Sequence, residues 1–206
     1  MDKKYVTKPI IFLISGYARA GKDTYAEFIK KHVNKDIYVY RINFADELKV
    51  VANEVLGSLG LKRHGNFFDD AFKTANRPVL TAIGNMARSI DPDIFVKKFI
   101  ATFDCLNNGR APAVYICSDW RYVNEYTYLV KHLDNKSYIV PRYVRKLGSL
   151  PANEEEKESI KELTQFVKPE AIYADEGHLD TLEQFGINAA NYVNDYFEQT
   201  KDLNGQ

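Results

Sequence analysis

An apolar run that ends in a glycine-rich loop is the feature that most constrains this chain. The run "IIFLIS" (10–15) is followed directly by "GYARAGKDT" (16–24). A short run of β-branched and aromatic residues favours a strand that is buried on both faces. From Thr24 onward, apolar residues recur at helical spacing. Strand, loop and helix in this order predict an α/β unit with the loop at the carboxyl end of a buried strand.

The spacing inside the loop is G-x-x-x-x-G-K, formed by Gly16, Gly21 and Lys22. Glycines let backbone amides surround phosphate oxygens, the lysine neutralises phosphate charge, and the following helix adds its N-terminal dipole. The common motif has Ser or Thr directly after the lysine, whereas here Asp23 comes first and Thr24 second. We predict a nucleotide-phosphate loop in which the Thr24 hydroxyl, and not the Asp23 carboxylate, ligates Mg²⁺.

Further apolar segments alternate with helical patterns along the rest of the chain. The predicted strands are 10–15, 37–44, 113–119, 137–145 and 171–175, and helical patterns begin at Thr24, cover 45–60 and 77–90, begin again near Asp91 and fill the closing segment. Residues 61–76 have little periodicity and are interpreted as a loop-rich excursion. The alternation predicts a three-layer α/β fold of the P-loop NTPase type: a mostly parallel five-stranded sheet with helices on both faces. We expect one domain over 1–206.

Composition narrows the choice of partners. The 206 residues include 28 basic and 28 acidic ones, so no net field attracts nucleic acid or an anionic membrane. The two cysteines, Cys105 and Cys117, have neither metal-ligand spacing nor the density of a disulfide scaffold, and are interpreted as small buried residues in a reducing compartment. No apolar run approaches the length of a membrane span, and the first one suits a strand better than a signal peptide. We expect a cytoplasmic protein with no nucleic-acid or membrane partner.

Charged residues near the predicted strand ends suggest the rest of a site. Asp119 follows the third predicted strand, where a P-loop protein keeps the carboxylate that holds Mg²⁺ directly or through water. A transferase that joins two anionic substrates also needs guanidinium groups for the acceptor phosphate and for the transferred group. The arginines in suitable positions are Arg19, Arg77, Arg88, Arg121, Arg142 and Arg145. Any one of them is more often a solvated charge, but the set favours a phosphoryl-transfer pocket.

Several segments in a fixed order carry a more specific similarity. They are "GYARAGKDT", "FADELK", "RPVLTAIGNMAR", "CSDWRYVNE" and "DEGHLDTLEQF". With these segments the chain resembles bacteriophage-type deoxynucleoside monophosphate kinases, in the nucleoside monophosphate kinase branch of the P-loop proteins, from about residue 10 to 195. A residue often separates the lysine from the threonine in that branch, as Asp23 does here. The chain departs from the family pattern at Glu47, where proline is frequent, and at Asn85, where threonine is frequent.

The resemblance implies ATP and Mg²⁺ as cofactors and a nucleoside monophosphate as the acceptor. The ATP phosphates would be bound by Gly16, Arg19, Ala20, Gly21, Lys22, Asp23 and Thr24. Arg77 and Arg88 would hold the monophosphate, Asp119 and Arg121 would line the catalytic centre, and Lys49 would face the acceptor. The acceptor-binding excursion would span about 45–100. A possible lid at about 146–168 would carry Arg142 and Arg145 toward the phosphates when it closes.

Three alternatives remain open from the sequence. One is another small-molecule P-loop kinase, of the dephospho-coenzyme A or phosphomevalonate type. A second is a nucleotide-binding switch or assembly protein that signals by conformation, and a third is a structural protein that retains the loop. The phosphate loop cannot separate the kinases from one another, because only residues on the acceptor side distinguish their substrates. Against the switch, the sequence shows no long effector region and has more arginines near the predicted strand ends than a switch requires.

Overall fold

The computed structural model describes residues 7–107, 112–174 and 179–204. Asp175, the last residue of the predicted fifth strand, and the start of "DEGHLDTLEQF" lie outside the described residues. Within the described part, no helix is both long enough and apolar enough to cross a membrane.

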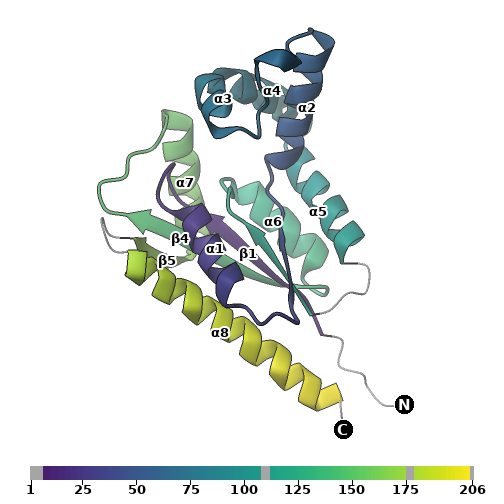
Figure 1. Cartoon of the computed structure of the whole chain (residues 1–206), viewed down its shortest axis with the longest axis vertical. Helices are drawn as coiled ribbons and strands as arrows, with labels where there is room; N and C mark the ends of the chain where they lie inside the picture. Colours follow the sequence, from purple (N-terminus) through teal and green to yellow (C-terminus); the bar gives the residue numbers. More distant parts are fainter. Residues whose placement is uncertain (1–6, 108–111, 175–178, 205–206) are drawn as a thin grey trace.

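One five-stranded sheet forms the centre of the molecule (Figure 1). Its strands are β1 (Ile10–Ser15), β2 (Tyr38–Arg41), β3 (Ala113–Cys117), β4 (Tyr138–Lys146) and β5 (Glu170–Ala174). Their order across the sheet is β2-β3-β1-β4-β5, and every pair of neighbours is parallel. All six residues of β1 are buried, as its continuous apolar run predicts for the central strand. The predicted α/β fold is therefore confirmed.

Helical segments connect the strands of this sheet. In chain order they are α1 (Lys22–His32), α2 (Asp46–Ser58), the 3₁₀ turn η1 (Lys62–His64), α3 (Asp70–Ala75), α4 (Arg77–Ile90), α5 (Ile94–Leu106), α6 (Val123–Leu133), α7 (Glu154–Val167) and α8 (Leu179–Asn204). Two of these elements correct the sequence interpretation of 61–76 as loop-rich, because η1 and α3 lie there. The helix α6 was not predicted from the sequence.

Alternate residues of β1 belong to two different hydrophobic cores, one on each face of the sheet. Ile10, Phe12 and Ile14 belong to the core shared with α1 and α8. Ile11 and Leu13 belong to the other core, which includes buried residues of α5, α6 and α7. This period of two is what a strand covered on both faces requires. The result is the predicted three-layer arrangement, with α1 and α8 on one side of the sheet in Figure 1.

A helical lobe, defined here as α2 to α4 (46–90), extends beyond the carboxyl ends of the strands (Figure 1). It begins right after β2, and α2 and α4 contact each other within it. The helix after the lobe, α5, returns to the sheet and buries Phe95, Phe99 and Phe103 in the core. The lobe thus faces the same sheet edge from which the glycine loop and the segment after β3 emerge.

The two cysteines differ in their surroundings. Cys117 is buried at the end of β3, whereas Cys105 is exposed on α5. The expectation that both are buried is wrong for Cys105, which lies near the helix end on the solvent side.

Candidate functional site

The loop between β1 and α1 has a backbone that only glycine fits at its start. Gly16 has φ 141°, and a Cβ placed there would lie 2.3 Å from the carbonyl oxygen of Val144 in the neighbouring strand. Gly21 is the N-cap of α1 with φ 99°, and Arg19 also has a positive φ, of 61°. Ala20 is buried, while the Arg19 side chain is exposed. The conformation turns the chain sharply from strand to helix, as the predicted phosphate loop requires.

Lys22 folds back over this loop. Its Nζ donates hydrogen bonds to the carbonyl oxygens of Gly16 and Tyr17, each at 2.7 Å. Burial, and next the charge of Arg121, lower the pKa of Lys22 to about 8, although Glu156 and other acidic groups oppose the shift. The ammonium therefore lies in a place where a bound anion would stabilise its charged form.

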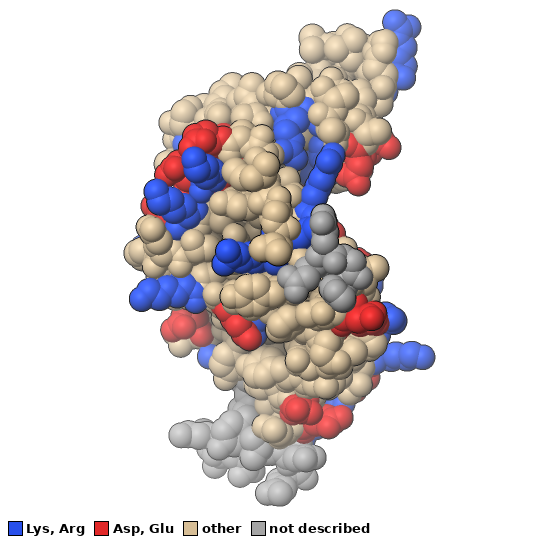
Figure 2. All heavy atoms as spheres, turned by 90° about the vertical axis from the view of Figure 1, so that its left-hand side faces the viewer, with Lys and Arg blue, Asp and Glu red and all other residues tan. Residues whose placement is uncertain are grey.

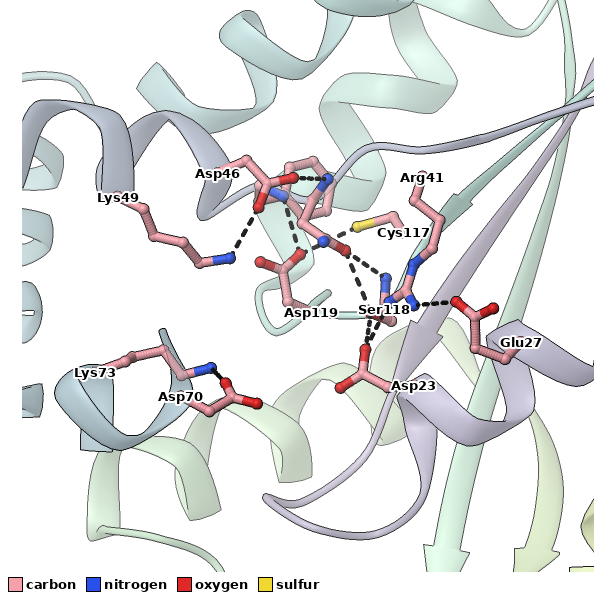
Figure 3. Close-up of polar contacts among 12 residues, drawn as sticks. Asp23, Glu27, Arg41, Asp46, Lys49, Asp70, Lys73, Cys117, Ser118 and Asp119 are labelled. Carbon is pink, nitrogen blue, oxygen red and sulfur yellow. Dashed lines mark hydrogen bonds and ion pairs between the residues drawn. The ribbon is translucent and has the colours of Figure 1, made fainter. Parts of the chain in front are cut away.

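Asp23 is held at the start of α1 by a group from β2 and a group from the segment after β3 (Figure 3). Its Oδ1 accepts from Nη2 of Arg41 at 2.6 Å and from the Ser118 hydroxyl at 2.7 Å. Arg41 also donates to Glu27 at 3.0 Å. Partial burial raises the pKa of Asp23, but the bonds from Ser118 and Arg41 outweigh it, and the pKa lies below its usual value. The carboxylate is thus a fixed part of the loop's support.

Asp119 lies at the end of β3, as predicted, and fastens the connection from β2 to the helical lobe (Figure 3). Its Oδ1 accepts from the backbone N–H of Phe44 and its Oδ2 from that of Ala45, both at 2.9 Å. The negative charge of Asp119 also acts to raise the pKa of Lys22. Each carboxylate oxygen can accept more than one hydrogen bond, so these contacts are compatible with a role at a cation.

The short connection from β3 to α6 (118–122), called here the turn after β3, carries Arg121. The backbone N–H groups of Arg121 and Tyr122 both donate to Oε2 of Glu125 at 3.1 Å. Burial raises the pKa of Glu125 to about 7. The Arg121 side chain reaches Glu156 of α7, with Nη2 and Oε1 3.2 Å apart. Arg121 is therefore fixed at its backbone by α6 and at its guanidinium by α7.

Arg88, which belongs to the helical lobe, lies beside Tyr122, the residue after Arg121. Its guanidinium carbon lies 4.5 Å from the ring centroid of Tyr122 and 4.7 Å from that of Phe95. The helix α4 continues without a break through Gly84, which lies against the guanidinium. Stacking on two aromatic faces holds a cation without neutralising it. The structure therefore brings Arg88 next to the turn that carries Arg121.

The other predicted residues lie around this centre. Lys49 is 2.8 Å from Asp46 in its own helix and 5.5 Å from the ring centroid of Phe68. Arg77 is exposed at the start of α4, eleven residues or about three helical turns before Arg88. Their roles toward an acceptor stay predictions.

Two further arginines belong to β4. Arg142 is ion-paired with Glu170 of the neighbouring strand, with Nη2 and Oε2 3.0 Å apart. Arg145 is exposed near the end of the strand. Both lie within the sheet, before the segment predicted as a lid, and their movement toward phosphates stays a prediction.

The surface view in Figure 2 shows one side of the molecule indented between its upper part and the remainder, with Lys and Arg atoms beside the indentation. Sequence reasoning missed four residues of the candidate site: Arg41, Ser118, Tyr122 and Glu156. Arg41 lies within the predicted strand 37–44, and a basic residue in that run was an available signal. The others depend on contacts between segments that are far apart in the chain.

No protein-family model matches the sequence, and no curated protein matches it. Solved structures that are similar to it include a sugar kinase from Janibacter sp. HTCC2649, 11% identical, with a TM-score of 0.45 over 92% of this chain and 98% of that one. A gluconokinase from Sinorhizobium meliloti 1021 is 13% identical, with a TM-score of 0.37 over 92% of this chain and 95% of that one. Similarity this remote carries no argument about activity. The fold class is defined by the chain's own geometry, a parallel α/β sheet whose central strand leads into a glycine-containing loop and a helix.

The lowered pKa of Lys22 predicts that nucleotide binding takes up protons. At about pH 8.5 a large share of Lys22 is neutral in the free protein, and a triphosphate raises its pKa by favouring the ammonium form. ATP affinity should therefore fall as the pH rises from about 7 to 9. Calorimetric titration in two buffers with different ionisation enthalpies measures the uptake. Lys30→Met, at an exposed position of α1, should keep the uptake and Lys22→Met should lose it. Equal proton uptake in both variants would contradict the assignment of Lys22 as the group that is protonated when ATP binds.

Proposed function

We propose that this chain transfers the γ-phosphate of ATP to a nucleoside or deoxynucleoside monophosphate and forms the diphosphate. The observation that carries the proposal is the convergence of three cations from different elements. Lys22 comes from the glycine loop, Arg121 from the turn after β3, and Arg88 from the helical lobe. Phosphoryl transfer depends on positioning and charge stabilisation more than on covalent steps by the protein.

The ATP side of the site would be the glycine loop. Its backbone and the N-terminus of α1 suit the β- and γ-phosphates, with Lys22 as the mobile cation among them. On binding, the phosphates would replace the carbonyl oxygens of Gly16 and Tyr17 as partners of the ammonium. This exchange would direct the charge of Lys22 toward the transferred group.

The donor chemistry at this end of the sheet also suits Mg²⁺. The Thr24 hydroxyl in the first turn of α1 and the Asp119 carboxylate are oxygen ligands of the kind that Mg²⁺ accepts alongside phosphates and water. The described residues contain no cluster of three or more acidic, His or Cys side chains that could hold a metal, so the phosphates and water would supply most of the ligands. A bound Mg²⁺ ion would neutralise part of the phosphate charge.

The acceptor side would be the space that the helical lobe faces. The Arg88 guanidinium lies against two rings, and it presents paired N–H donors that match a phosphate. Arg77 and Lys49 would add charge at the approach to this group. A nucleotide switch needs the loop cation but not a second cationic centre on a separate lobe, and this favours a transferase.

The segment at about 146–168 is proposed as the lid of this site. It contains the connection from β4 and the whole of α7, and its Glu156 reaches the glycine loop and Arg121. Because this segment contacts both the glycine loop and Arg121, phosphate binding there would change its contacts and could move it. Exclusion of water during transfer is the function that such a closing element serves.

A coupled assay of ADP release with a panel of acceptors tests the proposed function. The panel holds ribo- and deoxynucleoside monophosphates, dephospho-coenzyme A and phosphomevalonate. We expect turnover with at least one monophosphate and a loss of about a hundredfold or more in Lys22→Ala, because a preorganised charge is removed from the transition state. Turnover with a non-nucleotide acceptor alone would replace the proposed substrate class. Near-normal turnover in Lys22→Ala would overturn the loop's catalytic role.

Arg88→Lys should weaken use of the acceptor and leave ATP binding unchanged. Lysine keeps the charge but loses both the paired donors and the stacking between Phe95 and Tyr122. We expect kcat/KM for the monophosphate to fall about tenfold or more. Arg63→Lys, at an exposed position of the same lobe, is the matched control and should behave as wild type. An equal loss of ATP affinity in Arg88→Lys would place this residue on the donor side.

A further inference from the structure

We infer that Glu156 is a positioning residue that holds Arg121 beside Lys22, an inference that rests on the proposed phosphoryl transfer. Glu156 lies in the first turn of α7, and the residue is 1% exposed. Its Oε1 is 3.2 Å from Nη2 of Arg121, and its Oε2 accepts from the backbone N–H of Ala18 in the glycine loop at 3.4 Å. One carboxylate therefore links the loop, the turn after β3 and α7.

The burial of Glu156 makes Arg121 its necessary partner. A buried carboxylate is costly unless hydrogen bonds and an opposite charge compensate it. Its Oε2 is satisfied, because it also accepts from the backbone N–H of Ala152 at 2.7 Å. Its Oε1 is buried and has no hydrogen bond of good geometry in the part of the chain that the structure describes, so the Arg121 guanidinium is the group that balances it there. Movement of Arg121 away from this contact would therefore leave the buried carboxylate less well compensated.

The same contact resolves a conflict between two cations. The charge of Arg121 lowers the pKa of Lys22, whereas the charge of Glu156 raises it. Glu156 therefore offsets part of the repulsion that would otherwise drive the two cations apart. The Arg121 side chain is 38% exposed and has donors beyond the one that meets Glu156. The exposed part of the guanidinium can therefore meet a phosphate oxygen, so that Glu156 acts through Arg121 and does not itself touch the substrate.

A purely structural role for Glu156 makes a different prediction. Its backbone N–H is bonded to the side chain of Asn153, and its carboxylate to Ala152, so it also stabilises the start of α7. If that were its entire role, its replacement would harm the protein whether or not Arg121 is present. A double-mutant cycle separates the two cases, because coupling appears only if Glu156 acts through Arg121.

The cycle uses wild type, Glu156→Gln, Arg121→Ala and the double variant. Glutamine keeps an acceptor oxygen for Ala152 and removes the charge. We expect Glu156→Gln to lower kcat about tenfold or more with little change in the KM for ATP, and to add less than about twofold in the Arg121→Ala background. Glu158→Gln, the same change at an exposed site on α7, should keep wild-type kcat. An equal loss from Glu156→Gln in both backgrounds, or no loss in either, would overturn the inference.

A second readout does not depend on activity. The NMR signal of the Arg121 Nε–H group reports how firmly its guanidinium is held. The signal should be sharp and shifted in wild type and in Glu158→Gln, and it should move to the position of a solvated arginine in Glu156→Gln. An unchanged signal in Glu156→Gln would overturn the positioning role even if transfer occurs. The expected change in a protein that transfers no phosphate would support the positioning and reject the proposed function alone.

Discussion

The electrostatic repulsion between two positive side chains, Lys22 and Arg121, is the constraint on which the rest of the site depends. Burial and this mutual repulsion lower the pKa of Lys22. In the free protein the loop's own carbonyl oxygens stabilise the ammonium, and Glu156 balances the guanidinium. Two cations held in one place lower the stability of the folded protein when no ligand is bound, and a bound anion would restore it. A site with this property is preorganised for an anion such as phosphate.

The sheet brings the segments that carry these two cations to the same edge. A parallel sheet directs the carboxyl ends of its strands to one edge, and β1 and β3 are neighbours there. The glycine loop and the turn that bears Arg121 therefore leave the sheet side by side. The tight packing of Gly16 against Val144 and the two bonds from Asp119 to the connection after β2 then fix the loop and the helical lobe at that edge.

The sequence predicted the sheet well because β1 and β3 are continuous apolar runs, as burial on both faces requires. The strands β2, β4 and β5 are less buried and include charged residues, but each still contains a β-branched or aromatic stretch. The helix α3 was missed because six residues are too few to show a periodicity, although Asp69 accepts from Phe72 as an N-cap does. The sharp turn of the glycine loop from strand to helix was predictable because the spacing of its glycines is local. The ion pair of Arg121 with Glu156 and that of Arg41 with Asp23 were not, because each joins segments that only the fold brings together. Within a run of three glutamates, nothing local distinguishes the buried Glu156 from its exposed neighbours.

The central claim is that one site joins a nucleotide triphosphate to a nucleoside monophosphate. Binding of a bisubstrate analogue, two nucleosides linked by five phosphates, tests it most directly. We predict that one analogue binds per chain, more tightly than ATP or the monophosphate alone, and that it displaces both. An analogue that displaces ATP but leaves the monophosphate bound, or that binds no more tightly than ATP, would contradict this claim.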